Sequence, residues 1–187
     1  MRQQRRLLSA FQQKKAAQNL CSTLTLSPHF NRSKHVAIYL ANDGEIDPAR
    51  FITKLWKSKK NCYLPVLHPT KKNCLWFYLY TPQTRLTKNR FGILEPAINN
   101  KRKISPWALN LVLFPLVAFD EQGGRLGMGG GFYDRTFEFT REDKANALFN
   151  RTKLVGLAHH FQQVTSIPAE PWDIPLHGIA TDHNTLS

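Results

Sequence analysis

Acidic residues are scarce in this chain, and none precedes Asp43. Between Thr53 and Phe119, twelve Lys or Arg residues stand against the single Glu95, and the 187 residues together carry a net charge of +13. A field of this sign attracts polyanions such as nucleic acid, ATP or a polyglutamylated ligand, although a basic surface can also serve solubility alone. No known nucleic-acid-binding motif accompanies the charge, so we expect no nucleic-acid partner.

Long apolar runs are also missing. The longest, such as residues 111–119, are interrupted by Pro115 and are too short to cross a membrane. The N-terminus has no apolar signal-peptide core, because Arg2 to Arg6 stand there instead. We therefore expect a cytoplasmic protein with no membrane partner.

Cysteine is rare, and the three that occur match no zinc or thioredoxin spacing (Cys21, Cys62 and Cys74). We expect buried free thiols in a reducing compartment. The apolar fraction of 42% and the aromatic fraction of 11% are typical of a folded globule. The length suits one domain, which we expect to span residues 1–187.

Helical and extended patterns alternate along the chain. We expect three helices. The first runs from Arg2 to about Leu26 and is ended by Pro28. The second has Asp47 as N-cap and Pro48 at its first position and runs to about Lys60, and the third runs from Tyr133 to about Leu148. In the first helix the candidate core positions are Leu7, Phe11, Leu20 and Leu24. The expected strands are His35–Ala41, Cys62–Leu67, Cys74–Tyr80, Leu109–Phe114, Leu154–Ala158 and a short Gly178–Thr181.

This alternation predicts an α/β fold, a single three-layer domain with a mostly parallel central sheet covered on both faces. Ligands of such sheets bind beyond the carboxyl ends of the strands. That rule brings three segments to one edge: Leu40–Glu45, which contains a turn at Asn42-Asp43-Gly44, Pro115–Asp120, and the glycine-rich segment that follows. We expect the functional site there.

Six of the ten glycines fall between Gly123 and Gly131, in the string GGRLGMGGGFYDR. Glycine permits positive φ and lets backbone N–H groups approach a ligand closely. A glycine turn that leads into a helix N-terminus can bind phosphate, and Arg125 and Arg135 would add charge-assisted hydrogen bonds. Asp134 is an anion beside that site, which a Mg²⁺ ion between the two would explain.

The glycine string does not match either common nucleotide motif. No Gly-Lys-Ser/Thr follows it, as a Walker A loop requires, and the pattern G-x-G-x-x-G does not fit in register. From the glycines alone, a phosphate loop, a structural turn and another kind of anion site all stay open.

The segment RLGMGGGFYDR (125–135), preceded by FPLVAFDEQG (114–123), closely resembles the signature of 5-formyltetrahydrofolate cyclo-ligases, also called methenyltetrahydrofolate synthetases. Further blocks similar to that family follow its order: RQQRR (2–6), YLANDGEID (39–47), LPVL (64–67), FGILEP (91–96) and IPAEPWDIPL (167–176). Together these blocks span nearly the whole chain.

The resemblance implies an enzyme that uses ATP and Mg²⁺ to close 5-formyltetrahydrofolate, with or without a polyglutamate tail, into 5,10-methenyltetrahydrofolate. ADP and phosphate would be released after phosphorylation of the formyl oxygen. The implied fold is similar to that of sugar-phosphate isomerases and CoA transferases, and we expect a monomer. The alternatives are an enzyme of that isomerase or transferase kind, and a non-catalytic nucleotide- or RNA-binding module.

Carried over position by position, the resemblance implies four groups of residues. The ATP contacts are Arg2, Gln3, Gln4, Arg5 and Arg6, together with Arg125, Leu126, Gly127, Met128, Gly129, Gly130, Gly131, Phe132 and Tyr133. Folate would contact Leu40 and Glu45, and Mg²⁺ would be held by Asp134 and Asp173. We take Arg125, Tyr133 and Arg135 as the catalytic side chains. Some family members carry basic residues where this chain has Met128 and Gly130, so only backbone contacts are expected from these two.

Overall fold

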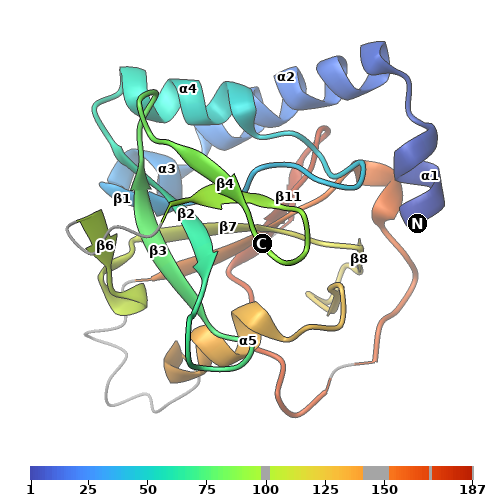
Figure 1. Ribbon diagram of the computed structural model, residues 1–187. Helices are drawn as coiled ribbons and strands as arrows, with labels where there is room; N and C mark the ends of the chain where they lie inside the picture. The colour runs from blue at the N-terminus through green and yellow to red at the C-terminus, as the bar shows by residue number, and fades with distance from the viewer. Residues whose placement is uncertain (98–101, 141–151, 169, 187) are drawn as a thin grey trace.

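The computed structural model describes residues 1–97, 102–140, 152–168 and 170–186 (Figure 1). Within these residues the main sheet has eight strands in the order β12-β11-β10-β7-β1-β2-β3-β6. Its strands are β1 (His35–Ala37), β2 (Asn61–Leu67), β3 (Leu75–Tyr80), β6 (Lys103–Ile104), β7 (Leu111–Pro115), β10 (Lys153–Leu157), β11 (Gly178–Ala180) and β12 (Thr185–Leu186).

The centre of this sheet is parallel and its margins are antiparallel. β1 pairs in parallel with β2 and β7, and β10 pairs in parallel with β7 and β11. β7 reads as a continuous apolar run, and its first four residues are buried, as expected for a strand covered on both faces. β3, β6 and β12 run antiparallel to their neighbours. The predicted α/β class with a mostly parallel sheet is confirmed.

Two layers cover the sheet (Figure 1). α2 (Ala10–Leu26), α3 (Pro28–Arg32) and α4 (Ala49–Lys57) lie on one face, where Leu20 and Phe51 belong to one apolar cluster. The short α5 (Phe132–Thr136) lies on the other face, where Phe137 joins a second cluster with Phe77 and Phe114. The central strands separate these two halves of the core.

The expected single N-terminal helix is wrong, because the chain breaks at Leu8–Ser9 into α1 (Arg2–Leu7) and α2. Ser9 caps α2: its hydroxyl accepts a hydrogen bond from Gln12 N at 3.3 Å, and the Gln12 side chain accepts one from Ser9 N at 2.8 Å. This reciprocal cap stabilises a helix start at Ala10. Of the predicted core positions, Leu20 and Leu24 are buried, but Leu7 and Phe11 are exposed.

Other element boundaries also differ from expectation. The first strand ends at Ala37, although the chain stays buried through Tyr39. Asp47 does bind a helical N–H group, that of Ala49 at 2.9 Å, but Pro48 is the N-cap residue and the helix ends at Lys57. Pro28 ends α2 as predicted and opens α3.

The helix expected from Tyr133 to Leu148 begins as predicted but ends early. α5 ends at Thr136, and a 3₁₀ turn over Glu138–Thr140 follows. Residues 141–148 of that prediction lie outside the described residues. The edge strands β6 and β12 of the main sheet were not predicted. Nor were four short strands that form two hairpins: β4 (Leu86–Lys88) with β5 (Leu94–Pro96), and β8 (Ala118–Phe119) with β9 (Arg125–Leu126).

The cysteines are free thiols, with Cys62 buried and Cys21 and Cys74 partly exposed. The expectation of burial therefore holds for one of the three. In the described ranges, no helix is long and apolar enough to cross a bilayer.

Gly156 in β10 offers a test of core packing. A Cβ atom at this position would lie 2.9 Å from Cγ of the buried Leu116. Because the core leaves no room for that methyl group, we expect Gly156→Ala to lower the free energy of unfolding by roughly 1–3 kcal/mol, measured by urea denaturation. Gly127→Ala is the matched control, since a Cβ there meets no atom within 4 Å. Equal stability of the two variants would contradict the tight packing of β10 against Leu116.

Candidate active site

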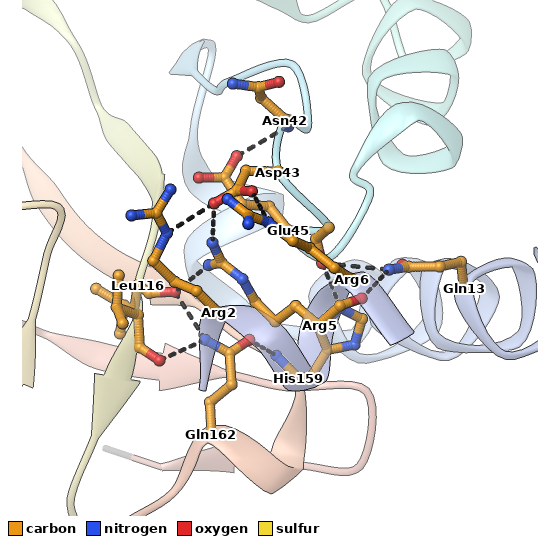
Figure 2. Close-up of polar contacts among 12 residues, drawn as sticks. Arg2, Arg5, Arg6, Gln13, Asn42, Asp43, Glu45, Leu116, His159 and Gln162 are labelled. Carbon is orange, nitrogen blue, oxygen red and sulfur yellow. Dashed lines mark hydrogen bonds and ion pairs between the residues drawn. The ribbon is translucent and has the colours of Figure 1, made fainter. Parts of the chain in front are cut away.

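The turn after β1 lies against the backbone of α1 at the carboxyl edge of the sheet (Figure 2). Gly44 has φ +73°, and a Cβ atom there would lie 2.8 Å from the carbonyl carbon and oxygen of Arg5. Glycine is therefore required for this approach. Its carbonyl accepts hydrogen bonds from Gln13 Nε2 and His159 Nε2, both at 3.2 Å. The turn thus joins α1, α2 and the end of β10.

Asp43 is the point on which the arginines of α1 converge (Figure 2). Its Oδ2 accepts hydrogen bonds from Arg2 Nε at 2.8 Å and from Arg5 Nη2 at 3.3 Å, and its Oδ1 pairs with Arg6 Nε. The hydrogen bond from Arg6 is the main reason why the pKa of Asp43 falls to about 2. The carboxylate is therefore charged and fixed at neutral pH.

The three arginines differ in their exposure. The side chain of Arg5 is fully enclosed, and its Nη1 donates to the carbonyl oxygen of Leu116 just beyond β7, at 3.1 Å. Arg5 thereby joins the ends of β1 and β7. The side chains of Arg2 and Arg6 are 47% and 55% exposed. Gln3 and Gln4, also predicted to contact ATP, lie exposed on α1.

Glu45 lies two residues beyond Asp43 and is half-buried. Its Oε2 accepts a hydrogen bond from Asn42 N at 3.0 Å. Burial raises the pKa of Glu45 from its ordinary 4.5 to about 7, and the neighbouring Arg5 opposes that rise. Leu40, the other predicted folate contact, is partly buried and packs against the core cluster on the helical face.

Tyr133, at the start of α5, stacks on Phe114 with ring centroids 4.7 Å apart. Burial raises the pKa of the Tyr133 hydroxyl, and the charge of Glu45 raises it further. These two side chains therefore interact electrostatically, although 88 positions separate them in the chain. The structure brings a predicted folate residue and a predicted ATP-loop residue into one electrostatic neighbourhood.

The glycine string divides into two parts, which the sequence did not predict. Gly123 and Gly124 belong to the turn of the β8–β9 hairpin. The buried Asp120 holds that turn, since its Oδ1 accepts from Gly124 N at 2.7 Å and its Oδ2 accepts from Ile167 N at 2.7 Å. Only residues 127–131 form the loop that leads into α5.

Within that loop, glycine is favoured at different positions for different physical reasons. Gly129 and Gly131 have φ of +79° and +61°, which side chains other than glycine rarely adopt. At Gly130 a Cβ atom would lie 2.7 Å from ring carbons of Phe132, so the ring would have to move. Gly131 is the N-cap of α5 and has no side chain to bind the first helical N–H groups.

Arg125 and Asp134 form an ion pair at this loop. The Arg125 side chain is mostly buried, donates to the carbonyl oxygen of Ile174 and pairs with Oδ1 of Asp134. The same Oδ1 accepts from Ile174 N at 3.4 Å. The segment carrying Asp173 is thereby held against α5, so the two predicted metal ligands come from adjoining segments.

Asp173 has a local role of its own, since its Oδ2 accepts a hydrogen bond from Glu170 N at 3.0 Å and closes a turn. In the described part of the chain, each of the two aspartates uses only one carboxylate oxygen. No group of three or more His, Cys, Asp or Glu side chains gathers there as a metal site. Two carboxylates suit Mg²⁺, which keeps several waters and takes phosphate oxygens as further ligands. The donor set therefore fits the predicted ion.

The remaining predicted residues lie at the surface of the same loop. Leu126, Met128 and Arg135 are exposed, and Phe132 packs edge to face with Phe91 of the β4–β5 hairpin at a centroid distance of 6.0 Å. Among the described residues, Arg135 makes no side-chain hydrogen bond or ion pair. The catalytic roles of Arg125, Tyr133 and Arg135 all stay predictions.

Sequence reasoning missed the residues that support the site. Asp43 was assigned only to a turn, and neither His159 nor Asp120 was among the predicted site residues. For Asp43 a signal exists in the sequence, because it is the first acid after a strongly basic N-terminus and opposite charges attract. No comparable signal marks His159, whose Nε2 binds the distant Gly44 carbonyl, or the bond between Asp120 and the distant Ile167 N.

The chain was compared with known proteins. The family model of the 5-formyltetrahydrofolate cyclo-ligase family matches residues 1–182. The chain is 42% identical over 173 residues to the 5-formyltetrahydrofolate cyclo-ligase of Haemophilus influenzae, covering 92% of this chain and 88% of that protein. It is 41% identical over 181 residues to that of Escherichia coli, covering 97% and 96%. This chain belongs to the 5-formyltetrahydrofolate cyclo-ligase family.

Solved structures agree with this membership. The 5,10-methenyltetrahydrofolate synthetase of Aquifex aeolicus is 30% identical with a TM-score of 0.79, over 98% of this chain and 87% of that one. The synthetase of Mycoplasma pneumoniae, at 21% identity and a TM-score of 0.72 over 97% and 93% of the two chains, shares the fold. The family match includes the α1 arginines, the turn after β1, the glycine loop and Asp173.

The raised pKa of Glu45 generates a stability prediction. The folded protein favours the neutral carboxyl group, so this contribution is fully present below pH 4.5 and is lost as pH rises towards 7. Glu45→Gln stays neutral throughout. We expect the variant to gain in free energy of unfolding relative to the unsubstituted protein between about pH 4.5 and pH 7, and then to level off. Urea denaturation across this range measures the difference, and a difference independent of pH would contradict the assignment.

Proposed function

We propose that this chain catalyses the ATP-dependent closure of 5-formyltetrahydrofolate to 5,10-methenyltetrahydrofolate, releasing ADP and phosphate. Membership of the cyclo-ligase family, over nearly the whole chain, carries this proposal. The relatives named above are cyclo-ligases and synthetases, which favours this activity over an isomerase, a transferase or a binding module. We propose a cytoplasmic location and a monomer as well.

The chemistry explains why ATP is consumed. The formyl group on N5 is an amide, which is a poor electrophile, and its oxygen is a poor leaving group. Transfer of the γ-phosphoryl group to that oxygen makes the formyl carbon electrophilic. N10 attacks this carbon and closes the five-membered ring, and the formyl oxygen departs as part of phosphate. The protein has to align oxygen with phosphorus and to stabilise charge, so no nucleophilic side chain is required.

The residues of the site suit these tasks. Arg2 and Arg6 are exposed cations beside the carboxyl ends of β1 and β7, where anionic phosphates would bind. The uncapped N–H groups at the start of α5, which follow the glycines, would face the same phosphates. Arg125 is mostly buried and would add its charge at the transferring group. The α5 helix has only five residues, so local N–H groups matter here more than a helix dipole.

The folate side of the proposed site is the turn after β1. Glu45 is half-buried and hydrogen-bonded to the backbone of Asn42, so its carboxyl group is held in one orientation. A polar group held in this way gives specificity for a polar substrate, here the folate ring system. Leu40 would contribute apolar contact. The basic surface would attract the glutamate tail, and a polyglutamate tail more strongly.

Mg²⁺ would be held by Asp134 and Asp173, and when bound it would neutralise charge on the phosphate oxygens. Arg125 keeps Asp134 oriented through their ion pair, and Ile174 N adds a second hydrogen bond to the same carboxylate oxygen.

We expect product only when ATP, a divalent cation and 5-formyltetrahydrofolate are all present, as measured by the near-ultraviolet absorbance of methenyltetrahydrofolate. With ¹⁸O in the formyl oxygen, we expect one labelled oxygen in the released phosphate, because that oxygen becomes part of phosphate. Turnover without ATP would refute the activity. Turnover that leaves the phosphate unlabelled would refute phosphorylation of the formyl oxygen.

For the metal, we expect Asp134→Asn and Asp173→Asn each to raise the Mg²⁺ concentration at half-maximal rate by at least about tenfold, since each removes a charged ligand. The control is Asp182→Asn, because Asp182 has its partners in His160 and His183. Thermal unfolding checks that the Asp134 variant survives loss of the Arg125 ion pair. Unchanged Mg²⁺ titrations in both variants would rule out this assignment.

A further inference from the structure

Asp43 binds the three arginines of α1 but is itself neither a proposed substrate contact nor a proposed metal ligand. Arg2 and Arg6 each reach Asp43 through Nε. In the described part of the structure, their terminal nitrogens Nη1 and Nη2 have no protein partner. A guanidinium group is planar and carries five N–H donors. Holding it by Nε therefore leaves the terminal pair of nitrogens, which can form bidentate contacts with phosphate, available to a ligand.

The charge balance of this cluster also favours an anionic ligand. Three guanidinium groups meet one carboxylate, so the cluster keeps a surplus of two positive charges. Arg2 and Arg6 are about half exposed, whereas Asp43 is only 13% exposed. An incoming polyphosphate therefore meets the cations first. Without Asp43, three cations would repel one another, and the two long exposed side chains would sample many rotamers.

The carboxylate of Asp43 is itself held in place. Asp43 has φ +53°, in the left-handed region, and the adjacent Gly44 is fixed by Gln13 and His159. Arg5 donates a partly buried hydrogen bond to the Asp43 carboxylate, and its guanidinium is itself held by a buried hydrogen bond to the carbonyl oxygen of Leu116. Asp43 and the adjacent Gly44 are thus tied by hydrogen bonds to α1, α2 and the residues that follow β7 and β10.

We propose that Asp43 is a positioning residue for the nucleotide: it holds Arg2 and Arg6 by Nε and directs their terminal N–H groups at the triphosphate, while Arg5 serves as a buried anchor. This inference rests on the proposed function, because it requires that ATP binds at α1. It also corrects the prediction for Arg5, whose enclosed side chain no phosphate reaches in this arrangement.

A competing interpretation predicts that removal of Asp43 changes the affinity for ATP in the opposite direction. If Asp43 merely competed with phosphate for the arginines, its removal would free them, and the loss of a negative charge would tighten ATP binding. If Asp43 positions the arginines, its removal weakens ATP binding although the site becomes more positive. The direction of the change therefore decides between the two.

The test is Asp43→Asn, because asparagine matches aspartate in size and tolerates the left-handed conformation. We expect the Kd for ATP, measured by calorimetry without folate, and the KM for ATP each to rise about tenfold, as for loss of a hydrogen bond between charged groups. We expect kcat at saturating ATP and the KM for 5-formyltetrahydrofolate to stay within about twofold. Unchanged or tighter ATP binding would overturn the proposal.

Asp47→Asn is the matched control. It removes the same charge close by in the chain, and Asn at this position still accepts the hydrogen bond from Ala49 N, seen here at 2.9 Å. Asp47 contacts no arginine in the described residues, so its variant should bind ATP like the unsubstituted protein. If both variants weakened ATP binding equally, a general charge effect would replace the positioning role.

A second variant keeps the test decisive if Asp43→Asn fails to fold. Arg6→Lys retains the charge at an exposed position. Lysine has a single ammonium nitrogen, however, so it cannot bind Asp43 through one nitrogen and offer two others to phosphate. We expect its Kd for ATP to rise about as much as that of Asp43→Asn, and the double variant to show less than the sum of the two free-energy changes. ATP binding by Arg6→Lys equal to that of the unsubstituted protein would overturn the proposal. Failure of the unsubstituted protein to bind ATP would instead refute the proposed function.

Discussion

The enclosed guanidinium group of Arg5 must find its partners inside the protein, because a buried charge without partners is very costly. It finds them at the ends of two neighbouring parallel strands, the Leu116 carbonyl beyond β7 and the Asp43 carboxylate beyond β1. This contact holds α1 against the sheet edge, and α1 carries the two exposed arginines. Removal of Asp43 would leave the enclosed Arg5 guanidinium without an anionic partner, so helix, turn and strand ends depend on one another.

The same edge explains why two substrates would meet here. The turn after β1 presents Asp43 to the arginines and, two residues later, Glu45 to the proposed folate side. The loop after β9 brings Tyr133 close enough for its pKa to respond to Glu45. Parallel strands end at the same edge, so segments far apart in sequence converge without any long excursion of the chain. A reaction that transfers a phosphoryl group from ATP to a folate needs such a meeting point.

The glycine string shows how one sequence feature can serve two structural purposes. Gly123 and Gly124 shape a hairpin turn that the buried Asp120 holds. Gly129 and Gly131 take positive φ in the loop before α5, where backbone N–H groups are left uncapped. Gly130 is constrained by the ring of Phe132 rather than by its own φ. A side chain at that position therefore requires the Phe132 ring to move.

Composition, apolar patterning and motif order were enough to determine the α/β class, the central strands and the family, because these depend on local preferences and on residues adjacent in the chain. They also placed Glu45 and the glycine loop at the correct edge. The break at Ser9, the short α5 and the division of the glycine string followed from caps and packing that a propensity pattern does not contain. The enclosed Arg5, the convergence on Asp43 and the effect of Glu45 on Tyr133 were decided only by the tertiary structure. Each depends on burial and on charges that folding brings together from distant parts of the chain, and a linear sequence does not encode that distance directly.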